Sequence, residues 1–327
     1  MASPLRVGTF SPSVLVRLAR DAGALARHQL SVREVPVPSS PAQFRALLAG
    51  ELDAALTSPD NVLVYRFGPT NPLNRLLDVR IVLAVDRGLG LSLFGRAGVD
   101  SVPDIRGGVL GVDVADSGFA YAGYELLGRA GLRRDVDYRV VELGSTPRRL
   151  RVLLAGDCDA TMLNAGNDLH AEEAGLRRLA RIGRSGAPYL GTVLAVPATA
   201  CVERDPRVGA LVRALRETAD ALLAGRHRKD AVRLAAQASG MSVSTAARYV
   251  DVLTDPDEGL VPSGRVDPAS LATVVDLRRR HQPTTPRETR PTSPPGPPST
   301  TSPTGTLDGA AVWGSGLVDE TFLRPDG

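Results

Sequence analysis

The amino-acid sequence predicts an α/β fold with two similar lobes, each built on a parallel-type sheet flanked by helices, and two crossover strands that join the lobes. Two observations support this fold class. Apolar residues alternate between strand-like and helix-like spacing along the first hundred residues. In addition, a segment of eight residues recurs 106 positions later with six identities. A chain of 327 residues is long enough for two such lobes.

The first part of the chain reads as strand, helix, strand, helix, strand. Short apolar runs mark the strands, and apolar residues three or four positions apart mark the helices. This order is typical of right-handed βαβ units on a parallel sheet. The predicted strands lie at 5–10, 31–37 and 53–57, and the predicted helices lie at 14–30 and 41–49.

The repeated segment has the sequence LLAGELDA at residues 47–54 and LLAGDCDA at residues 153–160. In both copies a helical pattern ends at glycine, a short apolar strand follows, and a polar loop comes next, at 57–61 and 164–168 respectively. Solenoid repeats recur every ~20–50 residues, so two copies at this larger spacing predict two similar lobes instead. Chance matching in a chain rich in Ala, Leu and Gly is the alternative.

The rest of the chain continues with alternating elements and then becomes helical. The apolar runs after the second copy of the repeat are expected to carry the chain back to the first lobe. Strands are predicted at 109–114, 138–143, 179–182 and 189–196, and helices at 119–131, 208–223, 229–238, 243–253 and 268–280.

Prolines gather near the C-terminus, where eight of the 25 lie between Pro283 and Pro303. Residues 282–306 are mostly Pro, Thr and Ser, and such a segment buries too little apolar surface to fold. We therefore predict a disordered linker at 282–306. Residues 307–327 regain apolar side chains, which predicts a C-terminal segment that docks on lobe one.

Composition excludes several classes of protein. The chain has 39 basic and 36 acidic residues, and this balance argues against a nucleic-acid groove. Residues 239–248 have a faint helix-turn-helix pattern, which we interpret as a packed helical corner.

No apolar run reaches the ~18 residues of a membrane span. The two cysteines, Cys158 and Cys201, match no metal-ligand spacing, so neither a metal nor a cofactor is predicted.

Taken together, these motifs resemble the type II periplasmic binding proteins, in the branch that includes aliphatic-sulfonate, taurine, nitrate and thiamine-precursor binding proteins. The resemblance covers residues 5–280 and implies a ligand held in a cleft between two α/β lobes. It implies a lobe one of about 1–86 plus 188–281 and a lobe two of about 87–187. The matching segments are 5–10, 47–60, 102–108, 128–136, 154–160 and 259–264, and residues 317–323 resemble the segment that ends many members.

The candidate binding residues follow from the position of the predicted strands. In open parallel sheets, ligands bind beyond the carboxyl ends of the strands, where the next helix begins. The serines among these residues also suit a helix N-cap without any ligand, and Arg87 also suits an exposed surface charge. The candidate residues are Phe10, Ser11, Ser39, Thr57, Ser58, Asp60, Asn61, Asp86, Arg87, Asp116, Ser117, Gly118, Phe119, Asn164 and Asn167.

No catalytic motif accompanies these loops, and His170 is the only weak catalytic candidate. The sequence therefore predicts a small-molecule binding protein whose cleft closes by hinge motion at 86–91 and 183–190. A cytosolic biosynthetic enzyme of the lyase or decarboxylase type and a non-catalytic cytosolic sensor are the alternatives. We expect a monomer that is cytoplasmic as written, or extracytoplasmic and partnered by an ABC permease if a leader was removed.

Overall fold

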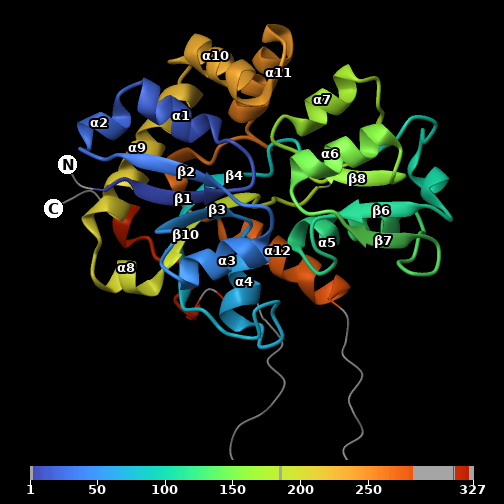
Figure 1. The fold of residues 1–327 in the computed structure, drawn as a ribbon, viewed down its shortest axis with the longest axis horizontal. Coiled ribbons are helices and arrows are strands. Elements are labelled where there is room, and N and C mark those ends of the chain that lie inside the picture. The colour runs from blue at the N-terminus through green and yellow to red at the C-terminus, as the bar shows by residue number, and fades with distance from the viewer. Residues whose placement is uncertain (1–2, 184–185, 283–311, 313, 324–327) are drawn as a thin grey trace, which may run out of the picture.

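The computed structural model describes residues 3–183, 186–282, 312 and 314–323. The predicted linker at 282–306 lies outside the described residues except for Gln282, as does part of the predicted C-terminal segment. The described strands form two sheets of five strands each, which lie side by side with helices around them (Figure 1). The predicted two-lobed α/β fold is therefore confirmed.

The first sheet has the strand order β2-β1-β3-β10-β4. Strand β1 pairs in parallel with β2 and β3, whereas β10 runs antiparallel to both β3 and β4. The sheet is mixed because the chain returns from the other lobe at the C-terminal ends of β3 and β4, so β10 runs in the opposite direction between them. The bounds are β1 (Leu5–Thr9), β2 (Val32–Pro36), β3 (Ala54–Thr57), β4 (Val79–Asp86) and β10 (Thr192–Pro197).

The second sheet has the order β7-β6-β8-β5-β9 and the same mixed character. Strand β6 pairs in parallel with β7 and β8, and β5 runs antiparallel to β8 and β9. The chain enters this sheet after β4 and leaves it after β9, so it crosses between the sheets twice. The bounds are β5 (Ser92–Gly95), β6 (Val109–Val112), β7 (Arg139–Glu142), β8 (Ala160–Leu163) and β9 (Arg178–Arg181).

Helices cover both sheets (Figure 1). In the first lobe these are α1 (Val14–Asp21), α2 (Ala24–Arg27), α3 (Ser40–Leu48) and α4 (Pro59–Phe67). In the second lobe they are α5 (Gly118–Arg129), α6 (Thr146–Ala155) and α7 (Asn167–Glu173), with the 3-10 turn η1 (Val102–Ile105). The chain after β10 forms α8 (Ala198–Val202), α9 (Pro206–Leu223), α10 (Arg228–Ser239), α11 (Val243–Thr254), η2 (Pro262–Gly264), α12 (Pro268–His281) and η3 (Thr321–Leu323).

The predicted helix at 14–30 is divided into α1 and α2 in the structure. Gly23, with φ 74°, adopts the left-handed conformation between them, and glycine takes this conformation at little cost. Helix α4 begins inside the predicted loop at 57–61, because Ser58 caps it and Pro59 occupies its first turn. The edges of the predicted elements therefore shift by a few residues, and the structure adds β4 and β5, which the sequence prediction did not include.

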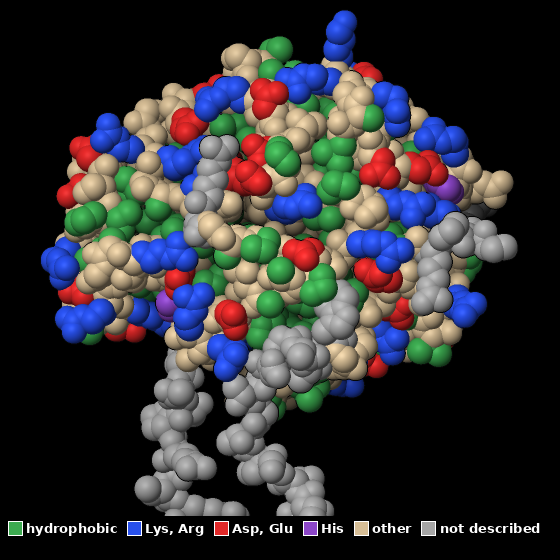
Figure 2. Space-filling view, turned by 180° about the vertical axis from the view of Figure 1, so that it is seen from behind, with side chains coloured by type: hydrophobic (Ala, Val, Ile, Leu, Met, Phe, Trp, Pro, Cys, Tyr) green, Lys and Arg blue, Asp and Glu red, His purple; other side chains and the backbone are tan. Residues whose placement is uncertain are grey.

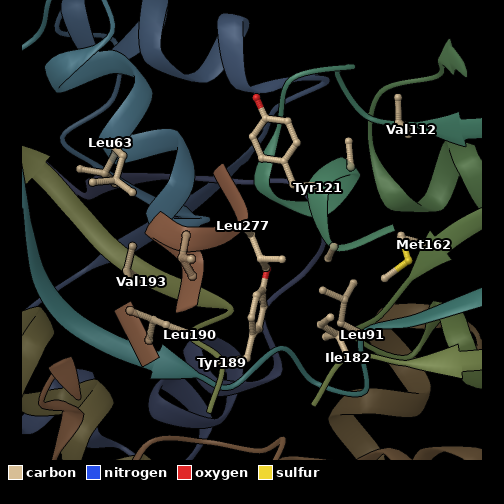
Figure 3. Packing of buried hydrophobic residues seen from close by; sticks show 14 of the residues in the cluster. Leu63, Leu91, Val112, Tyr121, Met162, Ile182, Tyr189, Leu190, Val193 and Leu277 are labelled. Atoms are coloured by element: carbon tan, nitrogen blue, oxygen red, sulfur yellow. The ribbon is translucent and has the colours of Figure 1, made fainter. Parts of the chain in front are cut away.

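The two lobes share one apolar core where the chain crosses between them (Figure 3). Leu91 lies in the first crossing, and Tyr189 and Leu190 lie in the second; all three are buried. They join Val193 of the first sheet to Met162 of the second within one cluster of buried side chains. These three residues of the crossings are thus packed into the shared core.

Residues 314–323 lie along β4, which is the last strand of the first sheet. The Ile81 amide donates to the Leu317 carbonyl at 2.8 Å, and the Asp319 amide donates to the Ile81 carbonyl at 2.8 Å. The Leu317 side chain is fully buried, and Arg80 pairs with Asp319. This segment covers a strand edge whose backbone groups would otherwise be unpaired.

The charged side chains do not gather by sign on the face shown in Figure 2, where basic and acidic groups are interspersed with apolar ones. This distribution lacks the basic stripe that typically marks a nucleic-acid binding surface. Among the described residues, no helix combines the length and the apolar character needed to cross a membrane.

Candidate functional site

A cavity lies between the two sheets and is lined by residues from both. The cavity has a volume of about 120 Å³. The lining comes from the loops that follow β1, β2, β3 and β4 in the first sheet and β6, β7 and β8 in the second. Helix α11 adds Tyr249 and Leu253. The carboxyl ends of the parallel strands therefore face this cavity, as expected for an open α/β sheet.

Serine residues occupy the N-cap position of five helices around the cavity. The side chains of four of them accept a hydrogen bond from a backbone amide in the first turn of their helix, whereas the Ser145 side chain makes no such bond. The positive ends of five helix dipoles thus converge on one space, which favours a negatively charged group there. The five N-cap residues are Ser13 (α1), Ser39 (α3), Ser58 (α4), Ser117 (α5) and Ser145 (α6), and all line the cavity.

The described residues of the lining include one cationic side chain, Arg149 of α6, which is only 1% exposed. Its guanidinium donates to the Met162 carbonyl at 3.1 and 3.3 Å, to the Gly144 carbonyl at 2.6 Å and to Thr146 Oγ1 at 3.0 Å. All of these acceptors are uncharged oxygens. Burial lowers the pKa of Arg149, because a buried cation without a contacting carboxylate is costly.

Two aspartates contribute carboxylates to the lining. Asp86, at the end of β4, is 1% exposed and accepts a hydrogen bond from the Gly88 amide at 2.8 Å. Burial raises the pKa of Asp86 to about 6, although hydrogen bonds from Thr192 and Gly88 act in the opposite direction. Asp113, after β6, accepts from Ser117 Oγ at 2.5 Å, and burial raises its pKa although Arg149 acts in the opposite direction.

Eleven of the fifteen residues that the sequence predicts as ligand contacts line the cavity. They come from both sheets, so the strand-end rule brings together side chains that lie far apart in the sequence. These eleven are Phe10, Ser11, Ser39, Thr57, Ser58, Asn61, Asp86, Ser117, Gly118, Phe119 and Asn164.

The other four predicted contacts lie outside the cavity lining and have partners elsewhere. Asp60 is fully buried in an ion pair with Arg278. Arg87 donates to the Leu260 carbonyl at 2.9 Å, and Asn167 donates to the Asn164 carbonyl at 3.0 Å. The Asp116 side chain is half-exposed and pairs with Arg134 at 3.4 Å.

The sequence prediction did not include several lining residues. Asp113, Ser145 and Thr146 follow strands as the predicted residues do, so the same rule applied to every strand would have found them. Arg149 lies one turn inside α6, and Tyr249 comes from α11 far along the chain. No local sequence pattern indicates that these last two side chains reach a cavity.

His170 lies in α7 and is not among the lining residues. Its Nε2 atom is 2.8 Å from the Ser239 carbonyl, and its Nδ1 atom is 3.6 Å from Glu173. The first contact joins α7 to the end of α10, and the second lies within α7. The arrangement suits a structural contact between helices.

No protein-family model matches the sequence, and no curated protein matches it significantly. Solved structures do match. The alkanesulfonate-binding protein SsuA from Xanthomonas axonopodis pv. citri, bound to MOPS, is 18% identical with a TM-score of 0.66, over 86% of this chain and 92% of that one. The periplasmic nitrate-binding protein NrtA from Synechocystis PCC 6803 is 10% identical with a TM-score of 0.69, over 85% of this chain and 79% of that one.

A desulfurization enzyme, DSZB, also matches, with 16% identity and a TM-score of 0.60 over 86% of this chain and 91% of that one. These likenesses show that the chain has the periplasmic binding protein fold, in agreement with the fold expected from the sequence. Binding proteins and an enzyme share this fold, so the function has to be argued from the cavity.

Proposed function

We propose that this protein binds a small solute in the cavity between its two lobes and closes around it by motion at the two crossings. The observation that carries this proposal is the cavity itself, which is lined from both sheets by polar loops at strand ends. A ligand held by both lobes favours the closed arrangement over the open one, because only the closed arrangement offers both sets of contacts. The neighbouring structures named for binding a sulfonate or nitrate support this proposal.

The charges around the cavity indicate the chemical class of the solute. Arg149 and five helix N-termini favour an anionic group on the solute. The Asp86 and Asp113 carboxylates oppose a second negative charge and favour a hydrogen-bond donor or an amine. We therefore expect a small organic molecule with one acidic group and at least one donor, bound partly through Ser, Thr and Asn side chains.

The enzymatic alternative has less support from the cavity. The described lining includes no histidine, cysteine or lysine, so its serines lack the usual base that would activate them. One of the similar structures is a desulfurization enzyme, so turnover of the solute should be measured as well as its binding. The sensor alternative predicts that solute binding changes the association of this protein with another protein.

Uptake of a solute requires an ABC permease as a partner and a location outside the cytoplasmic membrane. We propose that the protein works as a monomer, because its own two lobes supply both walls of the cavity. Cell fractionation distinguishes the roles: an extracytoplasmic protein fits uptake, and a cytoplasmic one fits the enzyme or sensor alternative.

The function can be tested without knowing the ligand. Native mass spectrometry of freshly purified protein is expected to show one retained small molecule per chain. Calorimetric titration with MOPS, other sulfonates, nitrate and amino acids is expected to show saturable binding at one site. Recovery of the bound compound unchanged supports binding, whereas its conversion into a product contradicts the proposal.

The capping serines allow a controlled test of the cavity. Ser58→Ala and Ser117→Ala each remove a helix cap and a hydroxyl from the lining, whereas Ser242→Ala removes the cap of α11 at a residue that is not part of the lining. All three variants are expected to lose about 1 kcal/mol of unfolding free energy. Only the first two are expected to weaken solute binding, by about tenfold each. Equal binding by all three variants would place the site elsewhere.

A further inference from the structure

Helix α12 lies between the two lobes and contacts a helix of each (Figure 1). One contact is with α4, which follows β3 of the first sheet, and the other is with α5, which follows β6 of the second. Its residues do not line the cavity. A helix in this position bears on how the lobes are held relative to each other.

Arg278, near the end of α12, joins three segments. Its Nε and Nη2 atoms donate to the two carboxylate oxygens of Asp60 at 2.6 and 2.8 Å. The Nη2 atom also donates to the Asp116 carbonyl at 2.9 Å, just before α5. The guanidinium carbon lies 5.0 Å from the centre of the Tyr121 ring, on α5. One side chain therefore bonds to the first residues of α4 and to the entry of α5.

The same two helix starts touch each other directly. A Cβ atom built on Gly118 would lie 2.5 Å from Asp60 Cβ and 3.0 Å from Asp60 Cγ, far inside normal contact. The lobes therefore approach as closely as they do because residue 118 is glycine. Gly118 itself lines the cavity, and so do Ser58 and Ser117 at the same two helix starts.

The contact is buried and therefore costly to break. Asp60 is fully buried and Arg278 is 4% exposed, so either charge would be left poorly solvated without the other. A second set of bonds lies farther along α12, where Arg280 and His281 contact Glu125 of α5 at 2.7 and 2.9 Å. If α12 moves with the first lobe when the lobes separate, its bonds to Asp116 and Glu125 are lost. If it moves with the second lobe, its bonds to Asp60 are lost.

We infer that Arg278 is a positioning residue that holds the two lobes in the closed arrangement, and so raises solute affinity without touching the solute. The inference rests on the proposed function in assuming that solute binding and closure are coupled. The closed arrangement itself can be measured without solute. Loss of the bonds from Arg278 to α5 is expected to shift the open–closed ratio about tenfold toward open.

Gly118→Ala tests this inference by adding the methyl group that meets Asp60. Gly128→Ala is the matched control, because it lies in the same helix and its added Cβ would meet nothing within 4 Å. Small-angle X-ray scattering without solute is expected to give a larger radius of gyration for Gly118→Ala than for the parent. Gly128→Ala is expected to keep the parent value. Equal radii for all three proteins, each folded by circular dichroism, would overturn the inference.

Arg278→Lys gives a second test that does not depend on Gly118→Ala folding. Lysine keeps a charge beside Asp60 but cannot bond to both carboxylate oxygens and the Asp116 carbonyl in the same fork geometry. Its radius of gyration without solute is expected to rise, and MOPS, if the parent binds it, is expected to bind about tenfold more weakly through a faster off-rate. An unchanged radius counts against the inference. If the parent binds no solute but the radii still differ, the proposed function fails and Arg278 keeps its role.

Discussion

Arg149→Met is expected to weaken the binding of an anionic solute by about a hundredfold or more. The guanidinium is the buried cation of the described lining, and hydrogen bonds to charged groups are worth about twice as much as neutral ones. Methionine fills similar space but supplies neither charge nor donors. The affinity is measured by calorimetric titration of the solute that the parent protein retains, with circular dichroism to confirm that the variant is folded.

Two further variants separate the charge of Arg149 from its structural bonds. Arg148→Met removes an exposed arginine from the same helix and is expected to bind solute as the parent does. Arg149→Lys keeps a charge but loses part of the bonding to Met162, Gly144 and Thr146. It is expected to bind with intermediate affinity. Parent-like affinity in a folded Arg149→Met protein would show that the solute does not use this cation.

The order of the fold could be predicted because each signal is local. The strand of residues 5–9 and the helix of residues 40–48 differ in apolar spacing, and the echo of LLAG at 47 and 153 marks two equivalent helix ends. Strand β4 was not predicted as a separate element. Seven of its eight residues are buried, so its apolar run shows no alternation from which a strand edge can be read.

In the candidate site, too, the residues with a local signal could be predicted and those that depend on tertiary packing could not. Ser58 and Ser117 could be predicted because both follow a strand and begin a helix, and the strand-end rule needs only local order. Arg149 and Tyr249 could not, because their approach to the cavity depends on how α6 and α11 pack. Asp60 shows the opposite failure: it has the right position in its loop, but Arg278, more than two hundred residues later, occupies its carboxylate.

Asp86→Asn is expected to make the protein more stable at neutral pH and to weaken its binding of a solute that carries a donor or an amine. Burial raises the pKa of Asp86 from 3.8 to about 6 in the folded protein. Between those values the folded state binds more protons than the unfolded state, so stability falls as pH rises through this window. The loss amounts to about 3 kcal/mol by pH 7, and asparagine does not incur it because it does not ionise.

Urea unfolding at pH 4 and pH 7 measures this difference, and Asp53→Asn provides a control of opposite sign. Burial also raises the pKa of Asp53, but hydrogen bonds from Arg6 outweigh it and hold that pKa below its usual value. Both pH values lie above the ordinary Asp pKa of 3.8, so Asp53→Asn is expected to lose stability relative to the parent at pH 4 and pH 7 alike, whereas Asp86→Asn gains stability at pH 7. If Asp86→Asn unfolds with the parent's pH dependence, the Asp86 carboxylate is not held at a raised pKa. A buried carboxylate that lowers stability is expected to serve binding. If Asp86→Asn gains stability and keeps the affinity of the parent protein, Asp86 does not contact the solute.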